Sequence, residues 1–129
     1  MEKDNHVSIW AGYSPTTESL EKYILIPYSE DGDQLGSQFS HQYHINNGGF
    51  IDEDFLELSC FEPVNSILEG MECSYYEYVS EQIEKAGKQF VERRINFAIL
   101  YFNYDYSGAV TESHHDDIST KFIGSFPYR

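Results

Sequence analysis

Five carboxylates lie on and beside one short stretch of the chain, FIDEDFLELSCFE at residues 50–62. They are Asp52, Glu53, Asp54, Glu57 and Glu62, and no Lys or Arg lies among them. A pair of carboxylates can act as general acid and base only where burial moves their two pKa values apart. Carboxylates can also meet a cationic partner, because opposite charges steer and orient association. Their number alone does not indicate a tuned catalytic pair, so partner contact is the better interpretation.

This stretch belongs to a much longer window of one charge sign. The chain has 129 residues, 22 of them acidic and 8 basic, and a formal net charge of −14. Residues 23–84 contain no Lys or Arg, and a second acidic group in this window consists of Glu30, Asp31 and Asp33. Nucleic-acid binding requires clustered Lys and Arg for the phosphates and is therefore excluded. A cationic protein partner is favoured, with general solubility as the alternative.

Histidines are the residues that bring metal chemistry into consideration. His41 and His44 are three residues apart in a segment expected to be helical, so both rings could reach one ion. Zinc sites need three or four ligands, however, and no C-x-x-C or H-E-x-x-H motif is present. In ESHHDD at residues 112–117, adjacent side chains of an expected loop point in different directions. We expect no metal; a small metal-dependent enzyme using His41, His44, His114 and Asp116 is the alternative function.

Nucleophilic catalysis has little support in the sequence. Of the two cysteines, only Cys73 lies near an expected helix start, where a thiol pKa is lowered, and nearby carboxylates oppose that effect. No G-x-S-x-G elbow, P-loop or G-x-G-x-x-G motif occurs. We therefore expect no catalytic residue, no cofactor and no enzymatic activity.

The cysteines and the apolar runs predict the compartment. Cys60 and Cys73 do not form a framework of paired spacings, which favours reduced thiols and a reducing compartment. The N-terminal MEKDNHVSIW has no apolar segment typical of a signal peptide, and no run of about 18 apolar residues occurs. The prediction is a cytoplasmic protein without a membrane segment.

Tyrosines accompany the acids in SYYEYVSEQIEK, residues 74–85. Tyr75 and Tyr78 are expected beside Glu77 and Glu81 on the outer faces of a helix. Exposed Tyr among carboxylates is typical of protein interfaces, because the ring contributes contact area at low entropic cost. The alternative is that both rings cover the edge of a sheet.

The first elements that would position these residues are a strand and a short helix. HVSIWAGY at residues 6–13 alternates and predicts a strand with one well-buried face, made by Val7, Ile9 and Ala11. Ser14 as N-cap and Pro15 at the first helical position then predict a short helix. A second short helix is expected in SQFSHQYHI, residues 37–45, and NNGG at 46–49 breaks it.

The second half of the chain predicts three strands and the clearest helix. A strand is expected at 55–61, a central strand with apolar residues on both faces at 95–106, a polar loop at 107–119, and a last strand at 120–128 with Phe122 and Phe126 on one face. Between the first two strands, Ser74 and Glu77 form the pattern of a capping box. The core stripe of that helix would be Tyr76, Val79, Ile83, Ala86 and Phe90.

The order of these elements indicates a single α+β domain over residues 1–129. We expect a sheet of about four mainly antiparallel strands, with two to three helices packed largely on one face.

Several of these segments together resemble a known family. VSIWAGYS at residues 7–14, LEKYI at 20–24, SQF at 37–39 and DEDFLE at 52–57 resemble the immunity protein 22 family of bacterial polymorphic toxin systems. The SYYEYVSEQIEKAGKQ helix and the strand beginning near Asn96 lie where that family has a helix and a core strand. The resemblance extends from about residue 7 to about residue 104. HQYHINNGGF and the SHHDD segment depart from the family pattern.

The resemblance implies a non-catalytic inhibitor that binds a cognate toxin domain, often a nuclease, inside the producing cell. The acidic window agrees with this, since a nuclease presents a basic groove to its substrate. We expect the partner surface to centre on Asp52, Glu53 and Asp54, with Glu57 and Glu62 beside them, Glu30, Asp31 and Asp33 as secondary contacts, and Tyr75 and Tyr78 adding apolar area. An acidic, self-assembling adaptor is a further alternative.

Overall fold

The strands and helices are described from a computed structural model that covers residues 2–48, 50–108 and 110–129. Gly49 of the expected NNGG break and Ala109 of the expected 107–119 loop lie outside the described residues. The strands are β1 (Glu2–Tyr13), β2 (Leu56–Ser66), β3 (Phe90–Tyr104), β4 (Glu112–His115) and β5 (Ile118–Pro127). The α-helices are α1 (Thr17–Ile24), α2 (Gln38–Gln42), α3 (Ile67–Gly70) and α4 (Tyr76–Lys85), and short 3-10 helices span Ile45–Gly48 and Glu53–Phe55.

The five strands form one antiparallel sheet in the order β2-β3-β1-β5-β4. β1 lies at the centre, between β3 and β5, with Trp10 opposite Ile99 on one side and Phe122 on the other. A central strand is covered on both faces, and Ser8 and Trp10 are therefore as fully buried as Val7. The expectation that only one face of this strand is buried is wrong.

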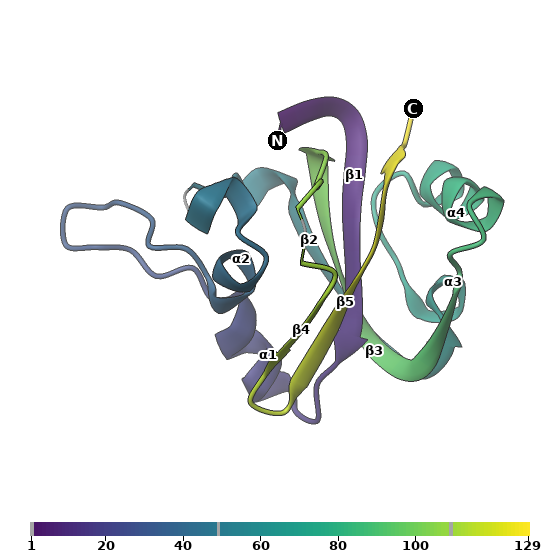
Figure 1. The fold of residues 1–129 in the computed structure, drawn as a ribbon, viewed down its shortest axis with the longest axis horizontal. Coiled ribbons are helices and arrows are strands. Elements are labelled where there is room, and N and C mark those ends of the chain that lie inside the picture. The colour runs from purple at the N-terminus through teal and green to yellow at the C-terminus, as the bar shows by residue number, and fades with distance from the viewer. Residues whose placement is uncertain (1, 49, 109) are drawn as a thin grey trace.

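Helices cover both faces of the sheet, in contrast to the expected packing largely on one face. Figure 1 shows α1 and α2 on one side and α3 and α4 on the other. The α1–α2 layer is rich in aromatic rings and includes Trp10, Tyr23, Phe39, Tyr43, Phe97 and Tyr101. The α3–α4 layer is mostly aliphatic and includes Val7, Ile9, Ile67, Val79, Ile83 and Leu100. The α+β class and the antiparallel sheet are confirmed.

Two helix starts differ from the expected ones. The N-cap of α1 is Thr16, whose side chain accepts a hydrogen bond from the Ser19 N–H, whereas Ser14 is clamped to Asn96 by two hydrogen bonds of 3.0 and 2.8 Å. The N-cap of α4 is Tyr75, which has a φ of 57° and no side-chain cap, so the expected capping box from Ser74 is wrong.

The expected core stripe of α4 is only partly buried. Val79 and Ile83 are buried, whereas Tyr76 and Ala86 are exposed. Phe90 is 74% exposed, because it begins β3 rather than continuing the helix. The apolar residues at steps of three and four therefore continue past Lys85, where α4 ends, and only Val79 and Ile83 of the stripe pack in the core.

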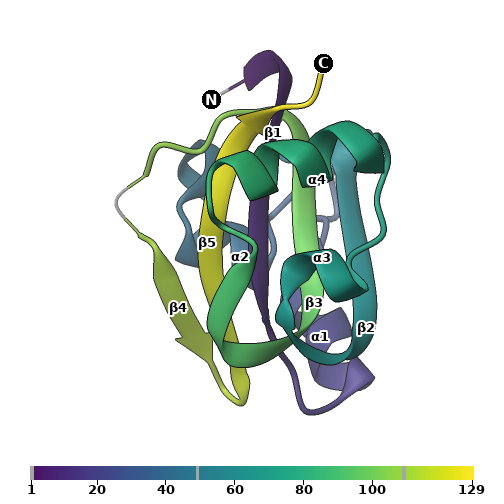
Figure 2. The same ribbon diagram turned by 90° about the vertical axis from the view of Figure 1, so that its right-hand side faces the viewer.

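The C-terminal region forms a β-hairpin where a loop was expected. β4 lies within residues 107–119 and pairs with β5, with Glu112 opposite Lys121 and His114 opposite Ser119. Together β2 and β4 form the two edges of the sheet, which is viewed across α3 and α4 in Figure 2.

A register shift between β1 and β5 changes which face each aromatic residue of β5 occupies. Ile9 lies opposite Gly124 and the next residue, Trp10, lies opposite Phe122. Phe122 packs against the α1–α2 layer and Phe126 against the α3–α4 layer, so the expectation that both lie on one face is wrong. Among the described residues, no helix is long and apolar enough to cross a membrane.

Candidate partner-binding surface

Four of the expected acidic contacts line one shallow cleft in the α1–α2 layer. The cleft has a volume of about 400 Å³. Its acidic residues are Asp33, Asp52, Glu53 and Asp54, and its other lining residues are Tyr28, Gly32, Gln34, Phe50 and Ile51. Two segments that are about 20 residues apart in sequence therefore present their carboxylates to the same hollow. We call this hollow the acidic cleft.

A projecting loop forms one wall of the acidic cleft. Residues 27–36 extend away from the body of the molecule at the left of Figure 1. The loop is a short hairpin, in which the Leu35 N–H donates to the Pro27 carbonyl and the Ser29 N–H donates to the Asp33 carbonyl, both at 2.8 Å. Gly32 has a φ of 86°, a conformation that favours glycine at the turn. The turn therefore places Asp33 on the cleft.

The second wall is fixed by side chains that bond to its backbone. The Gln34 side chain donates to the Ile51 carbonyl and accepts from the Ile51 N–H, both at 2.8 Å. The Tyr101 hydroxyl, which belongs to β3, accepts from the Asp52 N–H at 2.9 Å. These bonds join the loop, the acidic segment and the sheet, so the cleft is built before any partner arrives.

Asp52 also shapes the acidic segment itself. Its side chain caps the 3-10 helix Glu53–Phe55 by accepting from the Asp54 N–H at 3.1 Å. The helical turn directs Asp52, Glu53 and Asp54 outward immediately before β2 begins. Three adjacent carboxylates on such a turn form a concentrated negative field.

Aromatic side chains flank the acidic cleft. Tyr28 is 50% exposed and Phe50 is 65% exposed. The Tyr28 hydroxyl donates a hydrogen bond to the Glu53 carboxylate, and this bond raises the pKa of Tyr28. Exposed rings beside carboxylates give a protein partner both apolar area and charge. The sequence signal was present in PYSEDGD and GGFIDED, where each aromatic residue precedes the acids, but the fold was needed to join the two segments.

The remaining expected contacts are divided among other places. Glu30 and Asp31 lie on the projecting loop outside the lining of the cleft. Glu62 is exposed on the edge strand β2. Glu57 faces the opposite layer, where its carboxylate accepts from the Ser74 N–H at 3.0 Å and supports the segment that leads into α4. Glu57 thus has a structural role.

Tyr75 and Tyr78 lie in the α3–α4 layer, on the other side of the sheet from the acidic cleft. They are 46% and 59% exposed. The Tyr75 ring packs against Tyr128 with ring centroids 4.9 Å apart, and its hydroxyl accepts from Arg129 at 3.2 Å. A single flat contact would not cover these tyrosines together with the acidic cleft.

The residues of the alternative metal site are dispersed. The His41 ring lies 2.7 Å from the Leu35 carbonyl, and His44 lies beyond the end of α2 with a φ of 54°. His114 is on β4. In the part of the chain that the structure describes, no three His, Cys, Asp or Glu residues are grouped so that they could hold a metal ion.

The thiols are not activated. Burial, with a smaller contribution from Glu57, raises the pKa of Cys73 to about 12. Burial and Glu21 also raise the pKa of the exposed Cys60. Both shifts disfavour the thiolate, which is the reactive form.

Comparison with known proteins assigns the chain to a family of inhibitors. Residues 7–129 match the family described as immunity protein 22, which is nearly the whole chain, and the chain belongs to this family. Membership points to a toxin-neutralising role that is exerted by binding, since immunity proteins are generally non-catalytic. No curated protein and no solved structure gives a significant match.

Proposed function

We propose that the chain neutralises a basic, nuclease-type domain of a polymorphic toxin in the cytoplasm of the producing cell, and that the acidic cleft is the centre of the contact. The observation behind this proposal is the convergence of Asp33 with Asp52, Glu53 and Asp54 around one preformed hollow. Glu30 and Asp31 extend the negative field along the projecting loop, and Tyr28 and Phe50 supply apolar area.

Charge complementarity favours a nuclease as the partner. A domain that cleaves nucleic acid needs a groove lined with Lys and Arg to hold the phosphates. The acidic residues of the cleft would occupy that groove in place of the phosphates, and binding alone would then prevent catalysis. Such a contact forms rapidly at low salt, because opposite charges attract before the surfaces meet.

Association kinetics with the cognate toxin domain provide the test. We expect Asp52→Lys together with Asp54→Lys to slow association at least about tenfold at low salt and to flatten its dependence on ionic strength. A matched control reverses the same number of charges in the α3–α4 layer, at the exposed residues Glu69 and Glu84. Stopped-flow fluorescence over a series of salt concentrations measures both variants.

The control separates local contact from overall charge. Both double variants raise the net charge by the same amount, so a purely long-range effect would slow them equally. We expect the control to retain most of the association rate. Equal rates for the two variants, or an unchanged rate for the Asp52 and Asp54 variant, would remove the acidic cleft from the interface.

A further inference from the structure

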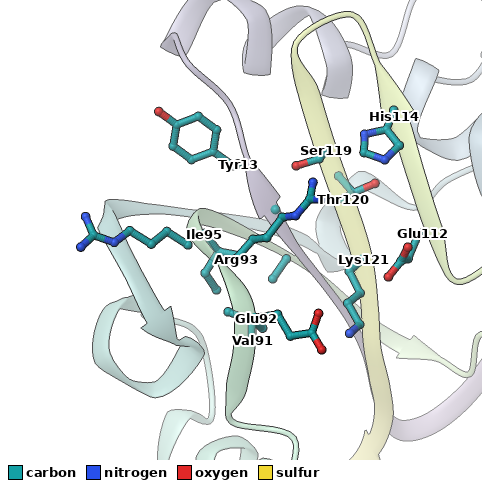
Figure 3. Close-up of a pocket in the computed structure, with 13 residues that line it drawn as sticks. Tyr13, Val91, Glu92, Arg93, Ile95, Glu112, His114, Ser119, Thr120 and Lys121 are labelled. Atoms are coloured by element: carbon teal, nitrogen blue, oxygen red, sulfur yellow. The ribbon is translucent and has the colours of Figure 1, made fainter.

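A second cleft, of opposite character, lies between the start of β3 and the β4–β5 hairpin. It has a volume of about 250 Å³. Its charged and polar lining residues include three of the eight basic residues of the chain, Arg93, Arg94 and Lys121, together with Glu92, Glu112 and His114. Figure 3 shows Arg93 reaching from β3 toward Ser119 and Thr120 on β5. We call this hollow the basic cleft.

The floor of the basic cleft is made by small residues of the sheet. Ala11 lies opposite Lys121, and Gly12 lies opposite Thr120. A Cβ atom on Gly12 would come within 2.0 Å of the Ser119 carbonyl oxygen, so no larger residue fits there. Gly12 therefore allows the backbones of β1 and β5 to approach closely at the base of the cleft.

Both walls of the basic cleft are held by hydrogen bonds from outside it. Asn96 clamps the end of β1 with bonds of 3.0 and 2.8 Å to the Ser14 backbone, which fixes the point where β3 runs past β1. Beneath the floor, the Thr120 hydroxyl bonds to the hydroxyl of Tyr43 at 2.7 Å. The Gln42 side chain donates to the His114 carbonyl at 2.8 Å. The geometry is therefore built and does not depend on a ligand.

The cations of this cleft lack close counter-ions. In the described residues, none of Arg93, Arg94 and Lys121 has a carboxylate within 4.0 Å, although the chain has 22 acidic residues. Like charges gathered at one hollow repel one another unless an anion joins them. Arginine forms paired hydrogen bonds with planar or tetrahedral oxyanions, and nearby hydroxyl groups such as that of Ser119 add donors.

From these features we propose that the basic cleft binds a small phosphate monoester, with Arg93 and Lys121 as its principal anchors. The volume equals roughly eight water molecules, which is more than an inorganic phosphate ion needs and suits a phosphate with a small organic group. The ring of Tyr13, 39% exposed at the rim, offers an apolar surface to that group. Glu92 and Glu112 also line the cleft and disfavour a ligand that carries negative charge beyond its phosphate group. This site is independent of the acidic cleft and of toxin binding.

Titration calorimetry with phenyl phosphate as the probe, on the full chain, tests the site. We expect saturable binding that weakens at least about tenfold in Arg93→Gln and in Lys121→Gln, because each loses a charge-assisted hydrogen bond. Lys88→Gln is the matched control, since it removes the same charge from an exposed residue just before β3 and outside the lining. The control should bind as the unmodified chain does.

Amide chemical shifts of the unmodified chain keep the test decisive if a variant folds poorly. Phenyl phosphate should move the amide resonances of residues 91–95 and 119–121 and leave those of the acidic cleft in place. Inorganic phosphate and phenylacetate should move the same resonances only at concentrations at least about tenfold higher. Absence of saturable binding below about 10 mM, equal weakening by Lys88→Gln, or equal affinity for phenylacetate would overturn the proposal.

Discussion

The two faces of the sheet bury different chemistry. The layer under α1 and α2 consists mainly of aromatic rings, several of which have hydroxyl groups, whereas the layer under α3 and α4 consists mainly of aliphatic side chains. An aliphatic side chain stabilises the fold only through the burial of apolar area. A tyrosine contributes burial and also a hydrogen bond at the far end of its ring. The aromatic layer can therefore hold irregular backbone in place while it packs.

The acidic cleft lies on the aromatic side of the sheet, where a tyrosine hydroxyl bonds to its backbone. Tyr101 reaches from the sheet to the Asp52 N–H, and Tyr23 and Tyr43 meet at the Thr120 hydroxyl. The opposite face has regular α4 packed on the sheet through Val79 and Ile83. We infer that the aromatic layer supports the surface that we propose for the toxin, and that the aliphatic layer chiefly stabilises the domain.

Removing the central ring of the aromatic layer should have the largest effect. Trp10 is fully buried and contacts the rings of Phe39, Tyr43 and Tyr106 at centroid distances of 5.0 to 5.7 Å. We expect Trp10→Ala to lower the free energy of unfolding by about 3–5 kcal/mol, measured by urea denaturation. Toxin affinity should fall as well, even at a temperature where the variant is folded.

Ile83→Ala removes a fully buried side chain from the aliphatic layer. We expect a loss of about 2–5 kcal/mol in the free energy of unfolding. The folded variant should retain its toxin affinity, because the acidic cleft is supported from the other face. If Ile83→Ala weakened toxin binding as much as Trp10→Ala, the claim that the aromatic layer alone supports the acidic cleft would be wrong.

A rise to alkaline pH should destabilise the aromatic layer, by less than the two substitutions above. Burial raises the pKa of Tyr23 from 10.0 to about 12. Above about pH 10 the unfolded chain loses this proton first, so the free energy of unfolding falls as pH rises, by about 2–3 kcal/mol at pH 12 from this residue. Urea denaturation across this pH range should show a shallower decline for Tyr23→Phe. Tyr78→Phe, at an exposed residue of α4, is the control and should follow the unmodified chain.

A smaller and more local effect is expected from Tyr101→Phe. The substitution keeps the ring but removes the acceptor of the Asp52 N–H, which costs about 1–2 kcal/mol of stability. Because Asp52 also caps the 3-10 helix, its neighbours should become more mobile and toxin association should slow. A variant with unchanged amide exchange at residues 52–54 would contradict the role that we give this hydroxyl.

The sequence predicted the class and most elements, since periodic apolar residues identify strands and helices locally. It predicted apolar residues on both faces only for the strand at 95–106, and it placed the helices largely on one face of the sheet. β1 alternates Val7, Ile9 and Ala11 with Ser8 and Trp10, and the buried state of Ser8 depends on bonds to residues 104 and 106, which are distant in sequence. Hydrogen bonds between distant residues leave no local pattern.

The candidate site was predicted as a charge pattern and not as a shape. The acids of residues 52–54 were identified from composition, but their meeting with Asp33 depends on Gln34 bonding to Ile51 across 17 residues. Glu57 was grouped with them because it is near in sequence. Alternation along β2 turns its carboxylate to the opposite face, where it bonds to Ser74.

Hydrogen–deuterium exchange of the chain, alone and bound to the cognate toxin domain, shows which face of the sheet the toxin contacts. The proposed contact predicts protection of residues 28–36 and 50–56 in the complex, with exchange in α4 and around the basic cleft unchanged. Protection confined to α4 and the Tyr75–Arg129 contact, with the acidic cleft exchanging as in the free chain, would contradict the account.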